Sequence, residues 1–475
     1  GTRYGGNLVR ACAVFVLFIA SFTYVTAQIN ATGTIASRAL GIPFELGVWV
    51  GLISILICSM LGGMRAVTWT QVAQYIVLII AYLLPVFWIS SKVGGGIFPH
   101  LMLGDEVARL GELEQQFGLV KNSAADMKAA GVPGGLKYIS GSHSGVPEGG
   151  MAVWKYLSLA ICMMVGTASL PHILMRYFTT PTVRAARKSV AWSLFFIFLL
   201  YSSAPMLATL SKLSLMDPNL PTGIIGKSIA DVQSLEWVQR WSEVKQVFIA
   251  DFNNDGILQL NEWFMRGDVV VLATPEVAGL PFVISGLVFA GGMAAAMSTA
   301  DGLVLAISNA LSHDIYYKII DPKADTAKRL LVARVLLVLI GAAGAYIASF
   351  RLTSILGSVA WAFDFAMSGL FFPLVLGVWW KRATREGAIA GIITGISSGL
   401  FYLLWVYPKF SNAIWGVTNT PILGIDHLRF GLIGAPICLV VMVVVSLMTK
   451  EPSPATQKMV DDTRIPTGKP ILGKQ

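Results

Sequence analysis

The stretch Gly291-Gly-Met-Ala-Ala-Ala-Met-Ser-Thr-Ala-Asp-Gly302 decides the fold class, because it places polar groups inside an apolar run over residues 277–320. Ala295, Ser298 and Thr299 stand at i, i+3 and i+4, so on a helix they share one face. Asp301 follows within the next turn, and we expect it to stay close to that face. Two hydroxyls, a carbonyl beside a small residue and a carboxylate are oxygen ligands that hard cations prefer. We therefore identify these four residues as candidate cation ligands.

Two interpretations of the Ser298-Thr299 pair stay open at this point. Serine and threonine commonly bond back to the preceding helical turn and join helices within membranes, which explains an isolated pair without any ion. The neighbouring Asp301 favours the ion-binding interpretation, because an unpaired carboxylate deep in a membrane has no packing purpose.

The composition is typical of a polytopic membrane protein. Of 475 residues, 55% are hydrophobic and 13% are charged, and the mean hydropathy is +0.68, whereas soluble domains carry about 25% charged residues. The net charge of +9 is therefore interpreted as loop charge on the cytoplasmic side rather than as a nucleic-acid footprint. All four cysteines fall within apolar segments, which argues against a disulfide framework.

Hydropathy in windows of about 19 residues predicts ten transmembrane helices. They lie near residues 8–28, 44–63, 66–90, 151–175, 186–211, 277–300, 328–350, 353–380, 386–407 and 429–449. The short connections carry 13 Lys and Arg residues in one alternate set and 4 in the other, so the first set is assigned to the cytoplasm. We therefore expect a transmembrane domain over residues 1–450, extracytoplasmic loops at 91–150 and 212–276, and a polar, mobile cytoplasmic tail at 451–475.

The fourth span carries a signal for a broken helix. Four small residues precede Pro171: Gly166, Thr167, Ala168 and Ser169. Proline removes a backbone donor and clashes with the preceding turn, so we expect these residues to unwind in mid-membrane, where transporters expose backbone dipoles to substrate. A simple proline kink is the alternative. His172 is interpreted as an interior histidine, since no second His, Cys or Glu lies at ligand spacing.

The second outer loop contains the twelve-residue pattern of a calcium loop, with oxygen ligands at positions 1, 3 and 5, glycine at 6 and glutamate at 12. The predicted ligands are Asp251, Asn253, Asp255, Ile257 through its carbonyl, Gln259 and Glu262. An apolar stripe from Leu235 to Phe248 predicts an amphipathic helix over residues 235–250 that enters the loop, and a second helix is expected to start at Glu262. We therefore expect an EF-hand-like insertion over residues 235–266, which binds Ca2+ as a structural site.

Motifs along nearly the whole chain together resemble the sodium:solute symporter family, which includes bacterial carriers of proline, sugars, pantothenate and acetate. The motifs are Gly62-Gly-Met-Arg-Ala-Val-Thr-Trp-Thr-Gln71, Pro171-His-Ile-Leu-Met-Arg176, Met297-Ser-Thr299 with Ser312-His-Asp-Ile-Tyr316, and Phe372-Pro-Leu-Val-Leu-Gly-Val-Trp-Trp380 followed by Thr384-Arg-Glu-Gly387. Pro373 with Trp379, and Arg385-Glu-Gly387-Ala-Ile-Ala-Gly391, are most similar to the acetate-permease branch.

The resemblance implies an all-α fold built as a five-plus-five inverted repeat, and a transporter rather than an enzyme. It assigns Ala295, Ser298 and Thr299 to sodium, and residues 166–169 to the substrate-facing part of a broken helix. Family members usually carry further spans at the N-terminus, so we expect this chain to be N-terminally truncated. Gln71 stands where several relatives carry aspartate, and we hypothesise that Asp301 supplies the missing charge as a second cation or proton site.

These observations predict sodium-coupled import of a small organic solute across the inner membrane, a short monocarboxylate such as acetate by branch resemblance. One alternative is a sodium-coupled amino-acid or sugar symporter, and another is a calcium-responsive membrane sensor on the same fold. A long cytoplasmic signalling domain would favour the sensor, whereas the short tail after Lys450 favours the carrier. The expected partners are sodium, the solute and the lipid bilayer, without nucleic acid.

Overall fold

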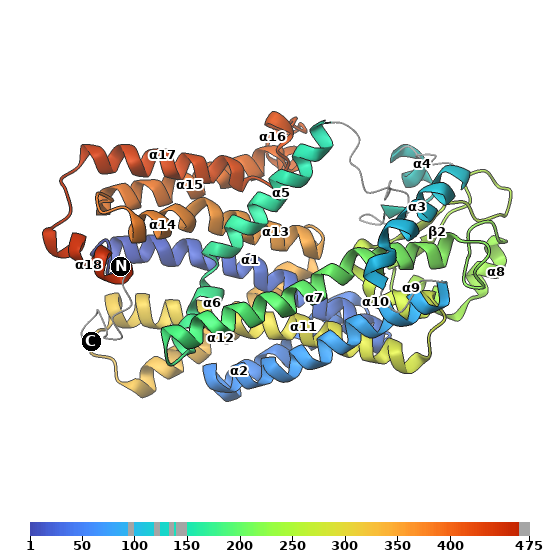
Figure 1. Ribbon diagram of the computed structural model, residues 1–475, viewed down its shortest axis with the longest axis horizontal. Coiled ribbons are helices and arrows are strands. Elements are labelled where there is room, and N and C mark those ends of the chain that lie inside the picture. The colour runs from blue at the N-terminus through green and yellow to red at the C-terminus, as the bar shows by residue number, and fades with distance from the viewer. Residues whose placement is uncertain (94–98, 118–123, 133–136, 139–149, 465–475) are drawn as a thin grey trace.

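Apolar segments form helices here because, in hydrocarbon, backbone polar groups must be hydrogen-bonded within their own segment. The computed structural model describes residues 1–93, 99–117, 124–132, 137–138 and 150–464, and its long helices run along the longest axis of the molecule (Figure 1). Within the described residues, eight helices are long and apolar enough to cross a membrane, and one bent pair makes a ninth span. The all-α membrane fold expected from the sequence is confirmed.

The spanning elements follow in chain order, with a shorter apolar segment, Phe44–Met60, at the start of α2. They are α1 (Asn7–Leu40), α2 (Phe44–Val93), the bent pair α5 (Gly150–Ser169) with α6 (Pro171–Leu174) and η1 (Met175–Thr179), α7 (Val183–Met216), α11 (Phe282–Asn309) with η3 (Ala310–Ile320), α12 (Thr326–Ser349), α13 (Ile355–Ala366) with η4 (Met367–Phe371) and α14 (Phe372–Trp379), α15 (Arg385–Val406), and α17 (Gly431–Met448).

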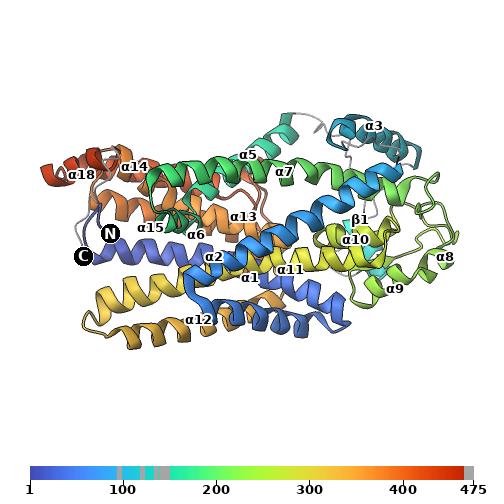
Figure 2. The ribbon, with the colours of Figure 1, turned by 60° about the horizontal axis from the view of Figure 1, so that its bottom comes forward.

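The second and third predicted spans both lie in α2, and the chain reverses direction between them (Figure 2). Ser59 donates to Asp301 and Gln71 donates to Ser298, although Ser298 and Asp301 lie only one helical turn apart. A straight helix would separate Ser59 from Gln71 by about 18 Å, so the two halves of α2 must fold back on each other. The predicted glycine turn falls at this place, and its side chains lie outside the described residues.

The first span is longer than predicted, since α1 continues to Leu40 rather than ending at residue 28. The additional turns bury polar side chains, among them Asn30, Thr32 and Thr34. Gly51 of α2 permits this, because a Cβ at Gly51 would lie 2.3 Å from Thr32 Oγ1. Small residues that let two helices approach closely are typical of membrane packing, and hydropathy alone does not register them.

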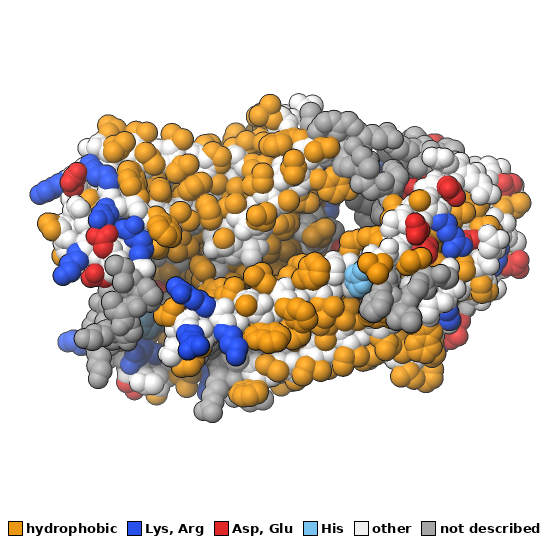
Figure 3. All heavy atoms as spheres, viewed as in Figure 1, with side chains coloured by type: hydrophobic (Ala, Val, Ile, Leu, Met, Phe, Trp, Pro, Cys, Tyr) orange, Lys and Arg blue, Asp and Glu red, His pale blue; other side chains and the backbone are white. Residues whose placement is uncertain are grey.

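Apolar side chains cover the middle of the molecule, and charged side chains gather at its two ends (Figure 3). This distribution is the one that a bilayer requires, since charged groups are costly within the hydrocarbon layer. It supports a multi-pass membrane protein independently of the length of any single helix.

The two long polar loops pack together at one end of the molecule (Figure 1). Their elements are α3 (Pro99–Phe117), α4 (Ala124–Ala129), β1 (Lys137–Tyr138), α8 (Ile229–Ser234), α9 (Glu236–Glu243), β2 (Val247–Ile249), β3 (Trp263–Met265), η2 (Gly267–Val269) and α10 (Val270–Val277). The strands form an antiparallel sheet in the order β1-β3-β2, which joins the first loop to the second. Arg38 of α1 pairs with Glu276 of α10 at 2.9 Å, and Trp241 also donates to Glu276 at 2.7 Å.

The helix predicted to enter the calcium-type loop is shorter than expected, and a strand replaces the predicted exiting helix. The entering helix α9 ends at Glu243, and Lys245 has a left-handed φ of 55°, which stops the helix. Residues on both sides of the loop then form β2 and β3, where Phe248 pairs with Phe264. The loop therefore closes a β-hairpin rather than a helix pair, because cross-strand pairing outweighs the local helical pattern.

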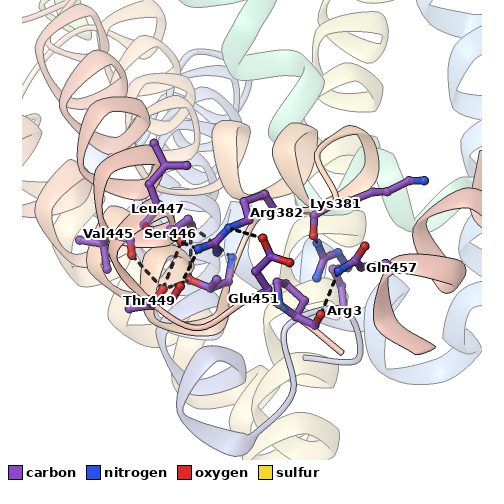
Figure 4. A network of polar contacts seen from close by, with 11 residues as sticks. Arg3, Lys381, Arg382, Val445, Ser446, Leu447, Thr449, Glu451 and Gln457 are labelled. Carbon is purple, nitrogen blue, oxygen red and sulfur yellow. Dashed lines mark hydrogen bonds and ion pairs between the residues drawn. The ribbon is translucent and has the colours of Figure 1, made fainter. Parts of the chain in front are cut away.

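The end of the chain also differs from the prediction of a mobile tail. Residues 454–464 form α18 (Pro454–Arg464), which Lys381 holds through an ion pair with Asp461 at 2.7 Å. Figure 4 shows the adjoining network, in which Arg382 donates to the Thr449 carbonyl at 2.6 Å and pairs with Glu451 at 3.4 Å. Residues 465–475 of the predicted tail lie outside the described residues. The remaining short helices are α16 (Pro408–Trp415) and η5 (Ile422–Gly424).

Candidate functional site

The predicted sodium ligands on α11 include a tight cluster of three. Ser298 Oγ donates to the Ala295 carbonyl oxygen at 3.0 Å, and Thr299 Oγ1 donates to the same oxygen at 3.3 Å. All three residues are partly exposed, whereas most of their neighbours on α11 are buried. Each hydroxyl oxygen keeps its lone pairs while it donates, so one face of the helix presents three hard oxygen atoms.

Asp301 does not join this cluster but faces a different helix. Its Oδ1 accepts from Ser59 Oγ of α2 at 2.8 Å, its Oδ2 has no hydrogen-bond partner, and the residue is fully buried. The side chain bonds to the first half of α2, whereas the Ser298 carbonyl bonds to Gln71 in the second half. A buried carboxylate with a free oxygen remains a strong attractor for a cation or a proton.

Gln71 connects the cluster to the broken helix. Its Nε2 donates to the Ser298 carbonyl at 2.6 Å, and its Oε1 accepts from Arg176 of η1. Gly302 leaves room for this arrangement, since a Cβ there would lie 2.8 Å from Arg176 Nη2. Sequence reasoning missed Arg176 and Gly302 as functional positions. Arg176 ends the Pro171 motif and Gly302 follows Asp301 directly, and either place was a usable signal.

The break in the fourth predicted span is present, but it lies later than predicted. Residues 166–169 remain helical to the end of α5, and the chain becomes extended at Leu170 before α6 begins at Pro171, with a bend of 49°. The prediction that these four residues unwind is therefore wrong. Proline at the first position of α6 interrupts only the adjoining turn, because its missing N–H falls where a helix start leaves it unbonded anyway.

The four residues predicted to face the substrate, Gly166 to Ser169, do not line a common cavity. Gly166 packs against Phe363, with a virtual Cβ 2.6 Å from the Phe363 Cβ, and Ser169 is buried and donates to the Gly166 carbonyl at 2.9 Å. Thr167 and Ala168 are exposed on the opposite side of α5. Only Ser169 lines the cavity of about 420 Å³ that lies against the break.

His172 is an interior residue, as predicted. Its ring contacts Tyr24 of α1 edge to face at a centroid distance of 5.6 Å, and Tyr24 makes a similar contact with Phe363 at 5.6 Å. The side chain is buried, yet Nδ1 has no hydrogen-bond partner. Sequence reasoning did not bring Tyr24, Phe363 and the break together, because they come from three separate spans.

The outer loop at residues 251–262 turns sharply, and its carboxylates bond within the loop. Asn254 and Gly256 are left-handed, with φ of 56° and 70°, and Asp251 Oδ2 accepts from the Gly256 N–H at 3.0 Å. The oxygens of Glu262 accept from the N–H groups of Phe252 and Gln259 at 2.8 and 2.9 Å. Among the described residues, no group of three or more His, Cys, Asp and Glu side chains is arranged to hold a metal.

Asp255, at position 5 of this loop, is exposed to solvent. Asp255 accepts a hydrogen bond from the Ile257 N–H, and this bond lowers the pKa of its carboxyl. Bonds from Asn253 and Gln259 lower it further, whereas slight desolvation raises it. The carboxyl therefore stays ionised at neutral pH, which is the state that a cation ligand requires.

Comparison with known proteins gives consistent results. An uncharacterized symporter of Cupriavidus necator is 37% identical over 97% of this chain and 77% of its own length. A monocarboxylic acid transporter of Corynebacterium glutamicum is 25% identical, covering 91% of this chain and 69% of that protein.

Among solved structures, a Na+-coupled sialic acid symporter in a substrate-bound outward-open state matches with a TM-score of 0.58 at 16% identity, over 95% of this chain and 76% of the other. That likeness concerns the fold. The sequence profile described as "Sodium:solute symporter family" matches residues 1–213 and 270–395. More than half of the chain is covered by that profile, so this protein belongs to the sodium:solute symporter family and is a membrane transporter rather than an enzyme.

Proposed function

We propose that this protein imports a short monocarboxylate together with sodium, and that Ala295, Ser298 and Thr299 hold the sodium ion. The observation that carries the proposal is the α11 cluster, which places the hydroxyls of Ser298 and Thr299 and the Ala295 carbonyl oxygen together on one partly exposed face of the helix. Neutral oxygen atoms suit a monovalent ion, because they attract it without binding it too strongly to release.

Asp301 supplies a second cation or proton position beside the cluster in this proposal. Its buried Oδ2 has no partner, and Ser59 fixes the other oxygen at 2.8 Å. Gln71 is engaged with Ser298 and with Arg176, so it provides position rather than charge. A carboxylate on α11 then takes the role of the aspartate that several relatives carry at the position of Gln71.

The solute binds against the break at Leu170, next to the cavity that Ser169 and Pro171 line. Sodium and solute are coupled because both favour the same conformation of α5 and α11, which Gln71 and Arg176 connect. The monocarboxylate class rests on the relative from Corynebacterium glutamicum and on the acetate-permease resemblance. Amino acids and sugars remain the competing substrate classes.

The experiment is uptake by the full-length protein in liposomes under an imposed sodium gradient. Labelled acetate is expected to accumulate, and the accumulation is expected to collapse when choline replaces sodium. Labelled proline and glucose are the matched controls. Accumulation of either control in place of acetate would overturn the monocarboxylate assignment, and sodium-independent accumulation would overturn the coupling.

We further propose that the loop at residues 251–262 binds calcium as a structural site on the outer face. Asp251 Oδ1 is buried without a hydrogen-bond partner, and the two left-handed residues give the loop the curvature that such sites need. The ligands in this proposal are Asp251, Asn253, Asp255, the Ile257 carbonyl, Gln259 and Glu262. Calcium would replace the internal bonds that these side chains now make.

Calcium is expected to raise the thermal midpoint of the wild-type protein, and Asp251→Ala is expected to abolish that increase. Asp231→Ala, in exposed α8, is the matched control and should respond like the wild type. An unchanged wild-type midpoint in calcium would refute the site. If calcium instead acts as a signal, it should change the uptake rate as well, which is the outcome that favours the sensor alternative.

The orientation is also part of this proposal: an inner-membrane protein with the outer loops extracytoplasmic and the C-terminal tail cytoplasmic. The excess of Lys and Arg in one set of connections supports it. A single cysteine at Asp231 should react with an impermeant thiol reagent in intact cells, in a background where the four native cysteines are replaced, and one at Thr456 should not.

A further inference from the structure

A second fully buried carboxyl group lies far along the chain from the sodium cluster. Asp364 of α13 is 0% exposed, and neither carboxylate oxygen has a hydrogen-bond partner. Ser368 follows one turn later in η4, is also 0% exposed, and its Oγ likewise has no partner. Buried polar groups in proteins are almost always hydrogen-bonded, so two adjacent exceptions within the membrane need a physical explanation.

Glycines of α17 form the opposite wall of this site. A Cβ at Gly431 would lie 2.7 Å from Asp364 Oδ1, and a Cβ at Gly434 would lie 2.4 Å from Ser368 Oγ. The nearest donors to the carboxyl are the Cys162 thiol and the N–H groups of residues 430 and 431, and none reaches hydrogen-bond geometry. The helices therefore pack directly onto this side of the carboxyl group.

Arg429, the basic group that acts on this site, is already engaged with other partners. The titratable and charged groups that act on this site are Cys162 of α5, and Asp426 and Arg429, which precede α17. Arg429 bonds to Asp426 at 3.0 Å, to the Lys155 carbonyl at 2.9 Å and to Ser158 at 3.3 Å. An ionised carboxylate here would be both unpaired and without hydrogen bonds, which is the least favourable state for such a group.

The surroundings also disfavour a metal ion. A hard cation needs several oxygen ligands, whereas the sulfur atoms of Cys162 and Met367 occupy the space beside Asp364. A proton needs neither space nor further ligands. The π-helical η4, which begins three residues after Asp364, is an irregularity that recurs at functional positions in membrane and soluble helices.

We propose that Asp364 is a proton-binding site, protonated when α5, α13 and α17 are packed as they are here, and loaded from the outer side. Protons enter from the end of α5 where Ser158 lies one turn before Cys162. Arg429, which donates to Ser158 at 3.3 Å, orients this entry and does not itself transfer the proton. The reaction is a reversible proton transfer: an O–H bond of a hydronium ion on the outer side breaks, one water molecule is released, and an O–H bond forms on a carboxylate oxygen of Asp364. Ionisation favours separation of the three helices, so the outside pH controls the conformational step of transport.

Infrared spectroscopy of the full-length protein in liposomes tests the site without relying on transport. The carbonyl stretch of a protonated carboxylic acid is expected at neutral pH in the wild type. The component of this band that comes from Asp364 is expected to be lost in Asp364→Asn and kept in Asp301→Asn. Asp231→Asn, an exposed aspartate, is the matched control and should keep the band. Replacing sodium by choline should leave the band unchanged.

A wild-type protein without this band at neutral pH overturns the proposal, even if Asp364→Asn does not fold. Loss of the band on adding sodium also overturns it, because a metal ion would then occupy the site. Where uptake is measurable, Asp364→Asn should make its rate independent of outside pH over the range in which the wild type responds. If the infrared band is present but no uptake is measured, the transport proposal fails and the proton-binding site at Asp364 stands.

Discussion

Gln71→Met is the most informative single change near the sodium cluster, because it keeps the length of the side chain and removes two hydrogen bonds. The lost bonds are the 2.6 Å bond from Nε2 to the Ser298 carbonyl and the bond that Oε1 accepts from Arg176. A typical hydrogen bond contributes about 0.5–1.5 kcal/mol net. Both bonds are partly open to solvent, so we expect a total loss of about 1–2 kcal/mol, which is a factor of about 5–30 in an equilibrium constant.

The loss should appear in sodium binding, because the freed segment around Ser298 must be ordered when the ion binds. Sodium-dependent acetate uptake in liposomes is expected to show an apparent sodium affinity weaker by about 5–30-fold. Gln74→Met is the matched control, since Gln74 lies one turn along α2 and its Oε1 has no hydrogen-bond partner. A Gln71→Met protein with the sodium affinity of the Gln74→Met protein would refute the reasoning.

Three further predictions concern other parts of the structure. Asp301→Asn removes the buried charge beside Ser59 and should weaken and flatten the sodium dependence of uptake; unchanged sodium and pH dependence would count against the second cation site. Gly395→Ala should lower the thermal midpoint, because the new Cβ would lie 2.2 Å from a backbone oxygen. Gly104→Ala is the control: its Cβ meets nothing within 4 Å, so it should raise the free energy of unfolding by about 0.5–1 kcal/mol. A Gly395→Ala protein more stable than the Gly104→Ala protein would contradict the packing described. Burial raises the pKa of Asp268 in the folded protein. The protonated carboxyl therefore stabilises the folded state fully below the ordinary pKa of about 4, and this stabilisation is lost as pH rises through the raised pKa. If Asp268→Asn leaves the dependence of stability on pH unaltered, this contribution is excluded.

The membrane fold was predictable because it depends on the local property of hydropathy, and nearly every predicted span overlaps an observed one. The α11 cluster was predictable for the same reason, since helical periodicity alone places Ala295, Ser298 and Thr299 together. Asp301 shows the limit of that argument. A turn of helix places its Cα near the cluster, but the partner Ser59 on α2 decides where its carboxylate points.

The errors share one cause, which is contact between segments far apart in the chain. Gly51 lets α1 bury Thr32, so α1 continues well beyond its predicted end. Pairing of β2 with β3 converts the predicted helices around the calcium-type loop into strands.

The most direct test of the account is sodium-driven uptake by the double variant Ser298→Ala, Thr299→Ala in liposomes. It removes the two hydroxyl oxygens that converge on the Ala295 carbonyl and leaves the small side chains that the helix packing tolerates. We predict that solute no longer accumulates above its outside concentration under a sodium gradient, while the folded protein is still recovered. Accumulation equal to that of the wild type would contradict the assignment of sodium to this face of α11.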